Sequence, residues 1–305
     1  ENYVCPNQHK WDIVNSIPRF INGYSNYTDA FGIQWNKYKK TQLDSYTGTD
    51  ISSSRLFRCL GNEILKFINK SKKVKILEVG CGAGRFTEVL LSFKNCYVTS
   101  IDYSNAVDAN LDNFPSSSKH QILQCDINNS PFDDSQFDVV LALGMVQHTY
   151  SPDLTIKNIF KLIKPGGYLV FDHYTPSFSY FTKSTMFFRP FLKRMKPSTG
   201  MRITERLVNW FFPIHYRVRN HRVLQAILSR FSPVRTYFHS FPDLAYKYQY
   251  EFSLLDTHDS LTDFYKHFRT KSQIKKLLMK LRATNISINK GGNGIEARCT
   301  KKSLN

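Results

Sequence analysis

The sequence predicts an α/β fold: a mainly parallel sheet covered by helices, with a helical and basic insertion. Three observations predict it. Apolar runs of strand length alternate with segments whose apolar residues recur at helical spacing. Closely spaced glycines follow the first run, as in a ligand-binding turn between a strand and a helix. Asp102 and Asp126 end the next two runs, at the sheet edge where such proteins bind ligands.

The most informative stretch is KILEVGCGAGRFTEVLLSF, residues 75–93. Its apolar start, Ile76–Val79, predicts a buried parallel strand, and residues 85–93 have helical spacing. Between them lie three alternating glycines: Gly80, Gly82 and Gly84. Glycine permits a tight turn and the close approach of a ligand, which the N–H groups of the following helix would face.

Further strands are predicted at CYVTSID (96–102), QILQCD (121–126) and FDVVLALG (137–144), and after the Lys164-Pro-Gly-Gly167 turn, ending near His173. TKSQIKKLLMKL then predicts a last helix, in which Thr270 and Gln273 form a capping box. NISINKGGNGIEARCT predicts a strand hairpin around Gly-Gly-Asn-Gly.

Taken together, the glycine-rich turn, Asp102, Asp126-Ile127 and the Lys-Pro-Gly-Gly turn resemble the class I S-adenosylmethionine-dependent methyltransferases. The resemblance covers roughly residues 52–175 and, by topology, 270–302. It implies a Rossmann-like, seven-stranded sheet with an antiparallel last strand, and S-adenosyl-L-methionine as cofactor. A nicotinamide-binding Rossmann domain is the main rival, but it prefers GxGxxG, and here the third glycine comes one residue early.

The resemblance also implies roles for individual residues. Asp102 would hold the ribose hydroxyls, Tyr103 would cover the adenine, and Asp126 would accept from the adenine amino group. In each case the alternative is an ordinary turn or a helix cap. The cofactor-binding residues implied in this way are Glu78, Gly80, Cys81, Gly82, Gly84, Asp102, Tyr103, Asp126, Ile127, Leu143 and Gly144.

The net charge of +18 is unevenly distributed. Residues 1–175 carry 18 Lys and Arg against 17 Asp and Glu, whereas residues 176–305 carry 24 against 7. This asymmetry indicates an acidic partner: a phosphorylated or lipid-linked acceptor, an anionic membrane surface or a nucleic acid. Six scattered cysteines without a CxxC pair favour a reducing, cytoplasmic setting, and no apolar run reaches membrane-spanning length.

We therefore divide the chain into an arm or lid (1–51), a cofactor-binding core (52–174), an insertion (175–269) and a last segment (270–305) that completes the core. The insertion is basic and aromatic and contains at least one amphipathic helix near Val218–Leu228. We interpret it as a substrate cap. Its aromatics lie among Leu, Phe and Pro, and no RNA-binding signature is present, so we favour a lipid-linked or phosphorylated acceptor over RNA. Peripheral attachment of the protein to the inner face of a membrane is a further alternative.

The arm carries a second resemblance. Its IPRF segment and Phe31-Gly-Ile-Gln34-Trp35 are similar to the leader of methyltransferases of bacterial surface-glycan and natural-product biosynthesis. This implies a lid with Trp35 or Tyr38 over the active site. Some relatives begin with a metal knuckle, of which Cys5 and His9 would be half, but no second pair follows.

We predict O-methylation of a sugar or another hydroxyl-bearing acceptor, with RNA (tRNA-type) methylation or a non-catalytic cofactor-binding scaffold as alternatives. A hydroxyl acceptor needs a base at the strand ends. We rank His258 first, then His173, then His148, and expect Asp256 to assist His258. In LDTHDSLTDFYKHFRT (255–270) we place Asp263 and His267 on one face of a short helix, and we predict no metal.

Overall fold

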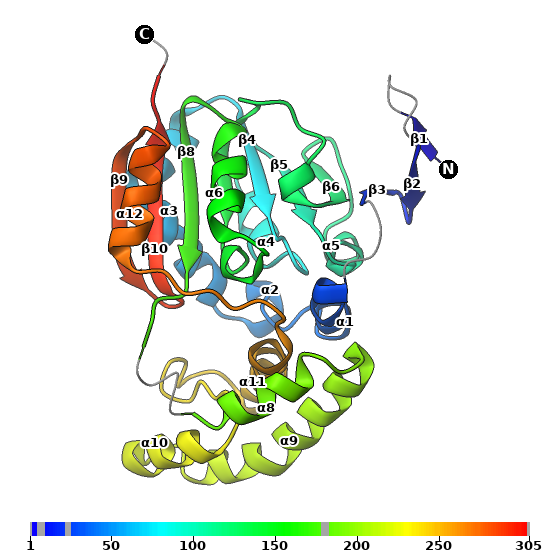
Figure 1. Ribbon diagram of the computed structural model, residues 1–305, viewed down its shortest axis with the longest axis vertical. Coiled ribbons are helices and arrows are strands. Elements are labelled where there is room, and N and C mark those ends of the chain that lie inside the picture. Colours follow the sequence, from blue (N-terminus) through cyan, green and yellow to red (C-terminus); the bar gives the residue numbers. More distant parts are fainter. Residues whose placement is uncertain (1, 5–9, 22–25, 178–182, 304–305) are drawn as a thin grey trace.

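The computed structural model describes residues 2–4, 10–21, 26–177 and 183–303 (Figure 1). Cys5 and His9, the half knuckle considered above, lie outside these residues. A sheet forms the centre of the molecule, and a helical layer lies beyond one end of its strands.

Seven strands form the sheet that the sequence predicts. They are β4 (Val74–Val79), β5 (Cys96–Asp102), β6 (His120–Cys125), β7 (Phe137–Ala142), β8 (Ile163–His173), β9 (Ala283–Gly291) and β10 (Gly294–Lys301). Their order is β6-β5-β4-β7-β8-β10-β9, and the first five are parallel. Only the last strand, β10, runs against its neighbours, so the mainly parallel sheet with a reversed last strand is confirmed.

The arm extends this sheet, which the sequence did not predict. The short strands β1 (Asn2–Val4), β2 (Lys10–Val14) and β3 (Ile17–Phe20) bring the sheet to ten strands. Strand β3 runs parallel to β6, and Arg19 donates to Gln124 at 2.9 Å and to Asp108 at 2.6 Å. The expectation of seven strands was therefore too low, because a four-residue strand paired with a distant one leaves little periodicity in the sequence.

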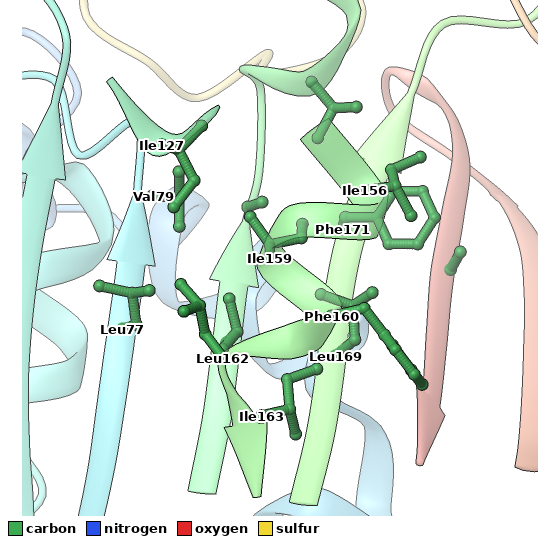
Figure 2. Packing of buried hydrophobic residues seen from close by; sticks show 14 of the residues in the cluster. Leu77, Val79, Ile127, Ile156, Ile159, Phe160, Leu162, Ile163, Leu169 and Phe171 are labelled. Atoms are coloured by element: carbon green, nitrogen blue, oxygen red, sulfur yellow. The ribbon is translucent and has the colours of Figure 1, made fainter. Parts of the chain in front are cut away.

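Helices cover both faces of the sheet. On one face α6 (Pro152–Lys161) and α12 (Lys271–Lys280) pack on β4, β7 and β8, and Figure 2 shows Ile159 and Phe160 beside Leu169 and Phe171. On the other face α3 (Ile51–Lys70) and α4 (Arg85–Leu91) bury a second apolar cluster, while α5 (Ala106–Asn113) packs near β6. Burial of this apolar surface is the main force that holds the layers together.

The insertion forms the helical layer at the carboxyl ends of the strands (Figure 1). It contains α8 (Thr185–Leu192), α9 (Pro197–Arg217), α10 (Arg222–Phe231) and α11 (Tyr246–Thr262), and a small core around Val208 and Phe212 joins α9 to α11. Helices α1 (Asp29–Lys37) and α2 (Asp44–Thr47) lie between this layer and the sheet. No helix in the described ranges is long and apolar enough to cross a membrane.

One local prediction in the insertion is wrong. Asp263 and His267 were placed on a short helix, but α11 ends at Thr262 and the chain from Phe264 to Thr270 is not helical. The Asp263 carboxylate is buried and lies 2.7 Å from Nε of Arg189 and 3.0 Å from Nζ of Lys266. The ion pair with the distant Arg189 and the local one with Lys266 take the place of the expected pairing with His267.

Candidate active site

A cavity of about 500 Å³ lies where the carboxyl ends of the central strands meet α1 and α11. Nine of the eleven residues expected to bind the cofactor line it, and they come from the ends of β4, β5, β6 and β7. These are Gly80, Cys81, Gly82, Asp102, Tyr103, Asp126, Ile127, Leu143 and Gly144.

The glycine-rich loop is tied to the neighbouring strand. The N–H groups of Gly80 and Cys81 donate to the carbonyl of Ile101, at 2.8 and 3.0 Å. Gly80 has φ +72°, and an added Cβ would lie 2.5 Å from Cβ of Met145. A side chain at this position would be strained and would also clash, so the loop can hold this shape only with glycine here.

Both strand-end carboxylates already take part in local hydrogen bonds. Asp102 accepts from the N–H of Gly82 at 3.0 Å and from the N–H of Ser104 at 2.8 Å, and burial raises its pKa. Asp126 accepts from the N–H of Asn128 at 2.8 Å and so caps the 3-10 helix η2 (Ile127–Asn129). The helix-cap interpretation holds for Asp126, and since both residues also line the cavity, their roles toward ribose and adenine remain predictions.

Two of the expected residues support the loop from behind instead of lining the cavity. Glu78 is buried and accepts from Thr87 at 2.6 Å and Ser100 at 2.9 Å, and burial raises its pKa to about 7. Gly84 has φ +95°, and an added Cβ would meet the ring of Phe114 at 2.7 Å. Both residues thus support the loop in this structure, and direct cofactor contacts by them remain predictions.

Of the two residues considered for the lid, Trp35 lines the cavity and Tyr38 does not, and a lid role for Trp35 remains a prediction. This residue lies on α1 and lines the cavity, with its indole 3.1 Å from the place of an added Cβ on Gly82. Tyr38 does not line the cavity; its hydroxyl donates to Glu205 at 2.5 Å. At the β5 end, Tyr27 packs against the predicted adenine cover Tyr103, with ring centroids 5.6 Å apart.

Two arginines that were not among the candidate site residues lie in the cavity wall. Arg55 forms an ion pair with Asp172 at 2.5 Å. Arg85 follows the last glycine and donates only to neutral groups, Ser52 Oγ at 2.9 Å and Gln42 Oε1 at 3.0 Å. Burial and the nearby Arg55 lower the pKa of Arg85 to about 9, so a carboxylate here would be strongly favoured. Its place directly after the glycines was the available signal.

The first two candidate bases do not face the cavity. His258 is fully buried on α11, with Nδ1 2.8 Å from Oε1 of Gln34. His173 is fully buried at the end of β8, with Nδ1 2.9 Å from the carbonyl oxygen of Tyr174. Burial lowers the pKa of each to about 4, and neither lines the cavity. The ranking of His258 and His173 above His148 is therefore corrected.

His148 does line the cavity, on the 3-10 helix η3 (Val146–His148) that follows β7. Its Nδ1 lies 3.1 Å from the carbonyl oxygen of Tyr265 and 3.2 Å from Oδ2 of Asp263. Burial alone would lower the pKa of His148, but the contact with Asp263 and the charge of Asp259 outweigh it and raise the pKa. Because both acceptors face Nδ1, this nitrogen carries the proton and Nε2 is the basic nitrogen.

Two further carboxylates line the cavity from one face of α11. Asp256 and Asp259 are three residues apart, and burial raises the pKa of both, that of Asp256 to about 6. Asp256 accepts a short hydrogen bond from the Tyr237 hydroxyl, so it does not assist His258. Within the described ranges, no three His, Cys, Asp or Glu side chains are arranged to hold a metal ion.

The insertion adds a pair of cations to the cavity, Lys183 and Arg235. Burial and the charges of Arg235 and Arg230 lower the pKa of Lys183 to about 8. In the described part of the chain, neither side chain has a carboxylate within ion-pair distance. A side cavity of about 90 Å³ is lined by the same two residues.

Comparison with known proteins identifies the central segment. Residues 77–171 match the family model of a methyltransferase domain. A ubiquinone biosynthesis O-methyltransferase of Coxiella burnetii is 34% identical over 112 residues, which are 35% of this chain and 47% of that protein. A reducing polyketide synthase of Aspergillus oryzae is 30% identical over 137 residues, 42% of this chain and 6% of that protein. The chain thus matches less than half the length of these curated relatives.

Solved structures with a similar arrangement were also found. A SAM-dependent methyltransferase from Methanosarcina mazei has a TM-score of 0.47 at 16% identity, covering 80% of this chain and 99% of that one. The CurJ carbon methyltransferase has a TM-score of 0.45 at 16% identity, covering 79% of this chain and 52% of that one.

Proposed function

We propose that this chain is a class I S-adenosylmethionine-dependent methyltransferase, in keeping with the methyltransferase-domain model that matches residues 77–171, and that it methylates a hydroxyl oxygen of a small anionic acceptor. The observation that carries the proposal is His148. It lines the same cavity as the cofactor-binding residues, and Asp263 and the Tyr265 carbonyl hold its Nδ1. A histidine held in this way is suited to accept a proton at Nε2.

The methyl donor and the protein contribute different parts of the proposed reaction. S-adenosylmethionine supplies a methyl group on a positively charged sulfur, so displacement in line with the sulfur–carbon bond requires mainly alignment. His148 Nε2 takes the hydroxyl proton as the oxygen–carbon bond forms and the sulfur–carbon bond breaks, with its electron pair going to sulfur. Asp263 stabilises the imidazolium that results. Trp35 and the insertion limit the access of water to the cavity.

The acceptor class follows from the wall that the insertion supplies. Lys183 and Arg235 offer unpaired positive charge within the described structure, which supports a phosphate or carboxylate on the acceptor. Asp256, Asp259 and the Tyr237 hydroxyl could orient further hydroxyl groups, as in a sugar. A phosphorylated or lipid-linked sugar, as in glycan biosynthesis, has both features.

The test is transfer of labelled methyl from S-adenosylmethionine to a cell extract divided into lipid, glycan, RNA and protein pools. We expect label in the glycan or lipid pool, resistant to RNase. Label that RNase removes would instead favour RNA as the acceptor. Tight cofactor binding with no label in any pool would contradict enzymatic activity and favour a scaffold.

His148→Ala tests the proposed base in the same assay. Turnover should fall by about 10²-fold or more, while affinity for S-adenosylhomocysteine stays unchanged. His239→Ala, in an exposed loop of the insertion, serves as the matched control and should keep full turnover. Unchanged turnover in His148→Ala would remove His148 from the mechanism.

A further inference from the structure

The outer side of the insertion exposes a group of large apolar side chains, each at least half exposed in the described structure. We call this group the outer apolar surface. Its members, each between 50 and 78% exposed, are Phe187, Phe191, Val223, Leu224, Ile227 and Phe231. Monomeric soluble proteins rarely leave apolar groups of this size together on the surface without a binding role.

Helix α10 shows the feature most clearly. Gln225 is its only buried residue, and it holds the helix to α9 by a hydrogen bond to His215 at 2.9 Å. The apolar positions Leu224, Ile227 and Phe231 are three and four residues apart, so they share one face of the helix. That face is exposed, whereas an amphipathic helix in a globular domain normally buries it.

The exposed ends of α8 and α10 adjoin each other. The N–H of Ser184, just before α8, donates to the carbonyl of Arg230 at 3.0 Å. Phe187 lies three residues after Ser184, and Phe231 directly follows Arg230. The bond therefore places the two phenylalanines near the same junction of α8 and α10. In Figure 1, α9 and α10 form the layer farthest from the sheet, so this side of the molecule is open to a large flat partner.

Positive charge surrounds the apolar group. Residues 183–235 contain twelve Lys and Arg but a single acidic residue, Glu205, which contacts Lys37 and Tyr38 on α1 and its C-cap. Exposed basic side chains belong to the turn after α8, to α9 and to α10: Arg194, Lys196, Arg202, Arg206, Arg217, Arg222 and Arg230. Aromatic and aliphatic side chains within a basic rim fit a bilayer that carries negative headgroups.

We propose that the outer apolar surface docks on an anionic lipid bilayer. Phe187, Phe191 and the apolar face of α10 enter the boundary between headgroups and acyl chains, while the arginines and lysines contact lipid phosphates. A second copy of the chain is disfavoured, because two surfaces of such positive charge repel each other. RNA is disfavoured because Val223, Leu224 and Ile227 have no ring to stack on a base.

Vesicle co-sedimentation of the whole chain tests the proposal without any acceptor. The probes are vesicles of phosphatidylglycerol with phosphatidylcholine, and vesicles of phosphatidylcholine alone. We expect binding to the anionic vesicles, weakened by added NaCl, and little binding to the neutral ones. Equal binding to both kinds, or to neither, would overturn the proposal.

Phe187→Ser/Phe231→Ser should bind anionic vesicles at least about tenfold more weakly, because two apolar anchors are lost. Leu154→Ser/Met279→Ser removes exposed apolar side chains from α6 and α12 of the core and should bind as the wild type does. Equal affinity of both double variants would reject the surface. Dimerisation abolished by the first variant would identify a second copy as the occupant and also reject the proposal.

S-adenosylhomocysteine binding by calorimetry shows that each variant is folded. The vesicle result does not depend on methyl transfer, so failure of the proposed reaction and failure of the docking surface are separate outcomes.

Discussion

At the scale of single residues, the proposed transfer of the acceptor's hydroxyl proton depends on the contacts that hold His148. Its Nδ1 faces Asp263 and the Tyr265 carbonyl, and the contact with Asp263 together with the charge of Asp259 outweighs the effect of burial and raises the pKa of His148. A base works only when it is neutral. A raised pKa therefore places the rise of turnover with pH at a higher pH than an ordinary histidine would give.

Asp263→Asn tests this relation. The variant loses the carboxylate charge that raises the pKa of His148, so the pH at which kcat reaches half its plateau should move downward. The measurement is kcat against pH for wild type and variant. A midpoint that stays in place, in a variant whose unfolding temperature shows it folded, would contradict the pairing.

The glycine-rich loop offers a stability test with a built-in control. Gly80→Ala should lower the free energy of unfolding by about 2–5 kcal/mol, because a positive φ is combined with a clash at Met145. Gly48 has nearly the same φ, +68°, but nothing lies within 4 Å of an added Cβ, so Gly48→Ala should cost only about 1–2 kcal/mol. Equal losses in urea unfolding would show that the contact with Met145 does not matter.

At the scale of elements, patterns among neighbouring residues were sufficient to predict the features that depend only on neighbouring residues. The strand at 96–102 was predicted to the residue, and the Thr270–Gln273 capping box is present with both reciprocal bonds. Such features depend on periodicity and on neighbours three residues apart. The pairing of β3 with β6 depends on residues more than a hundred positions apart, and no local pattern encodes it.

Helix α11 shows why the site was only partly predictable. Asp256, His258 and Asp259 are adjacent in sequence, which suggested one cluster. On a helix with 3.6 residues per turn, positions 256 and 259 share a face, whereas 258 points to the other side. The two aspartates therefore line the cavity, while His258 packs against Gln34. The order of the elements predicted that this segment lies near the cavity. Which of its side chains face the cavity depends on the segment being a helix, and the sequence did not indicate that.

The capping box supplies a prediction for the last helix. Thr270→Ala removes the acceptor for the Gln273 N–H and should lower the free energy of unfolding by about 0.5–2 kcal/mol. Lys276→Ala, an exposed change in the middle of α12, is the control and should alter stability by less than about 0.5 kcal/mol. A loss in the control as large as in Thr270→Ala would assign the effect to the helix body instead of its cap.

At the scale of the whole molecule, the sheet and the insertion form different sides of one cavity. The sheet presents strand-end carboxylates and a glycine-rich loop to one side of a cavity. The insertion, which carries half of the net positive charge, supplies the other side with Lys183 and Arg235. In the proposed function, the sheet side of the cavity would hold the cofactor and the insertion side would hold the acceptor.

The central claim is that this cavity binds S-adenosylmethionine with Asp102 at the ribose. Calorimetric titration with S-adenosylhomocysteine tests it most directly, on the wild type, on Asp102→Asn and on Asp134→Asn, a control at an exposed loop. The wild type and Asp134→Asn should bind one molecule equally well, and Asp102→Asn about tenfold or more weakly, since a hydrogen bond to a charged acceptor is lost. No binding by the wild type, or equal binding by all three proteins, would contradict the claim.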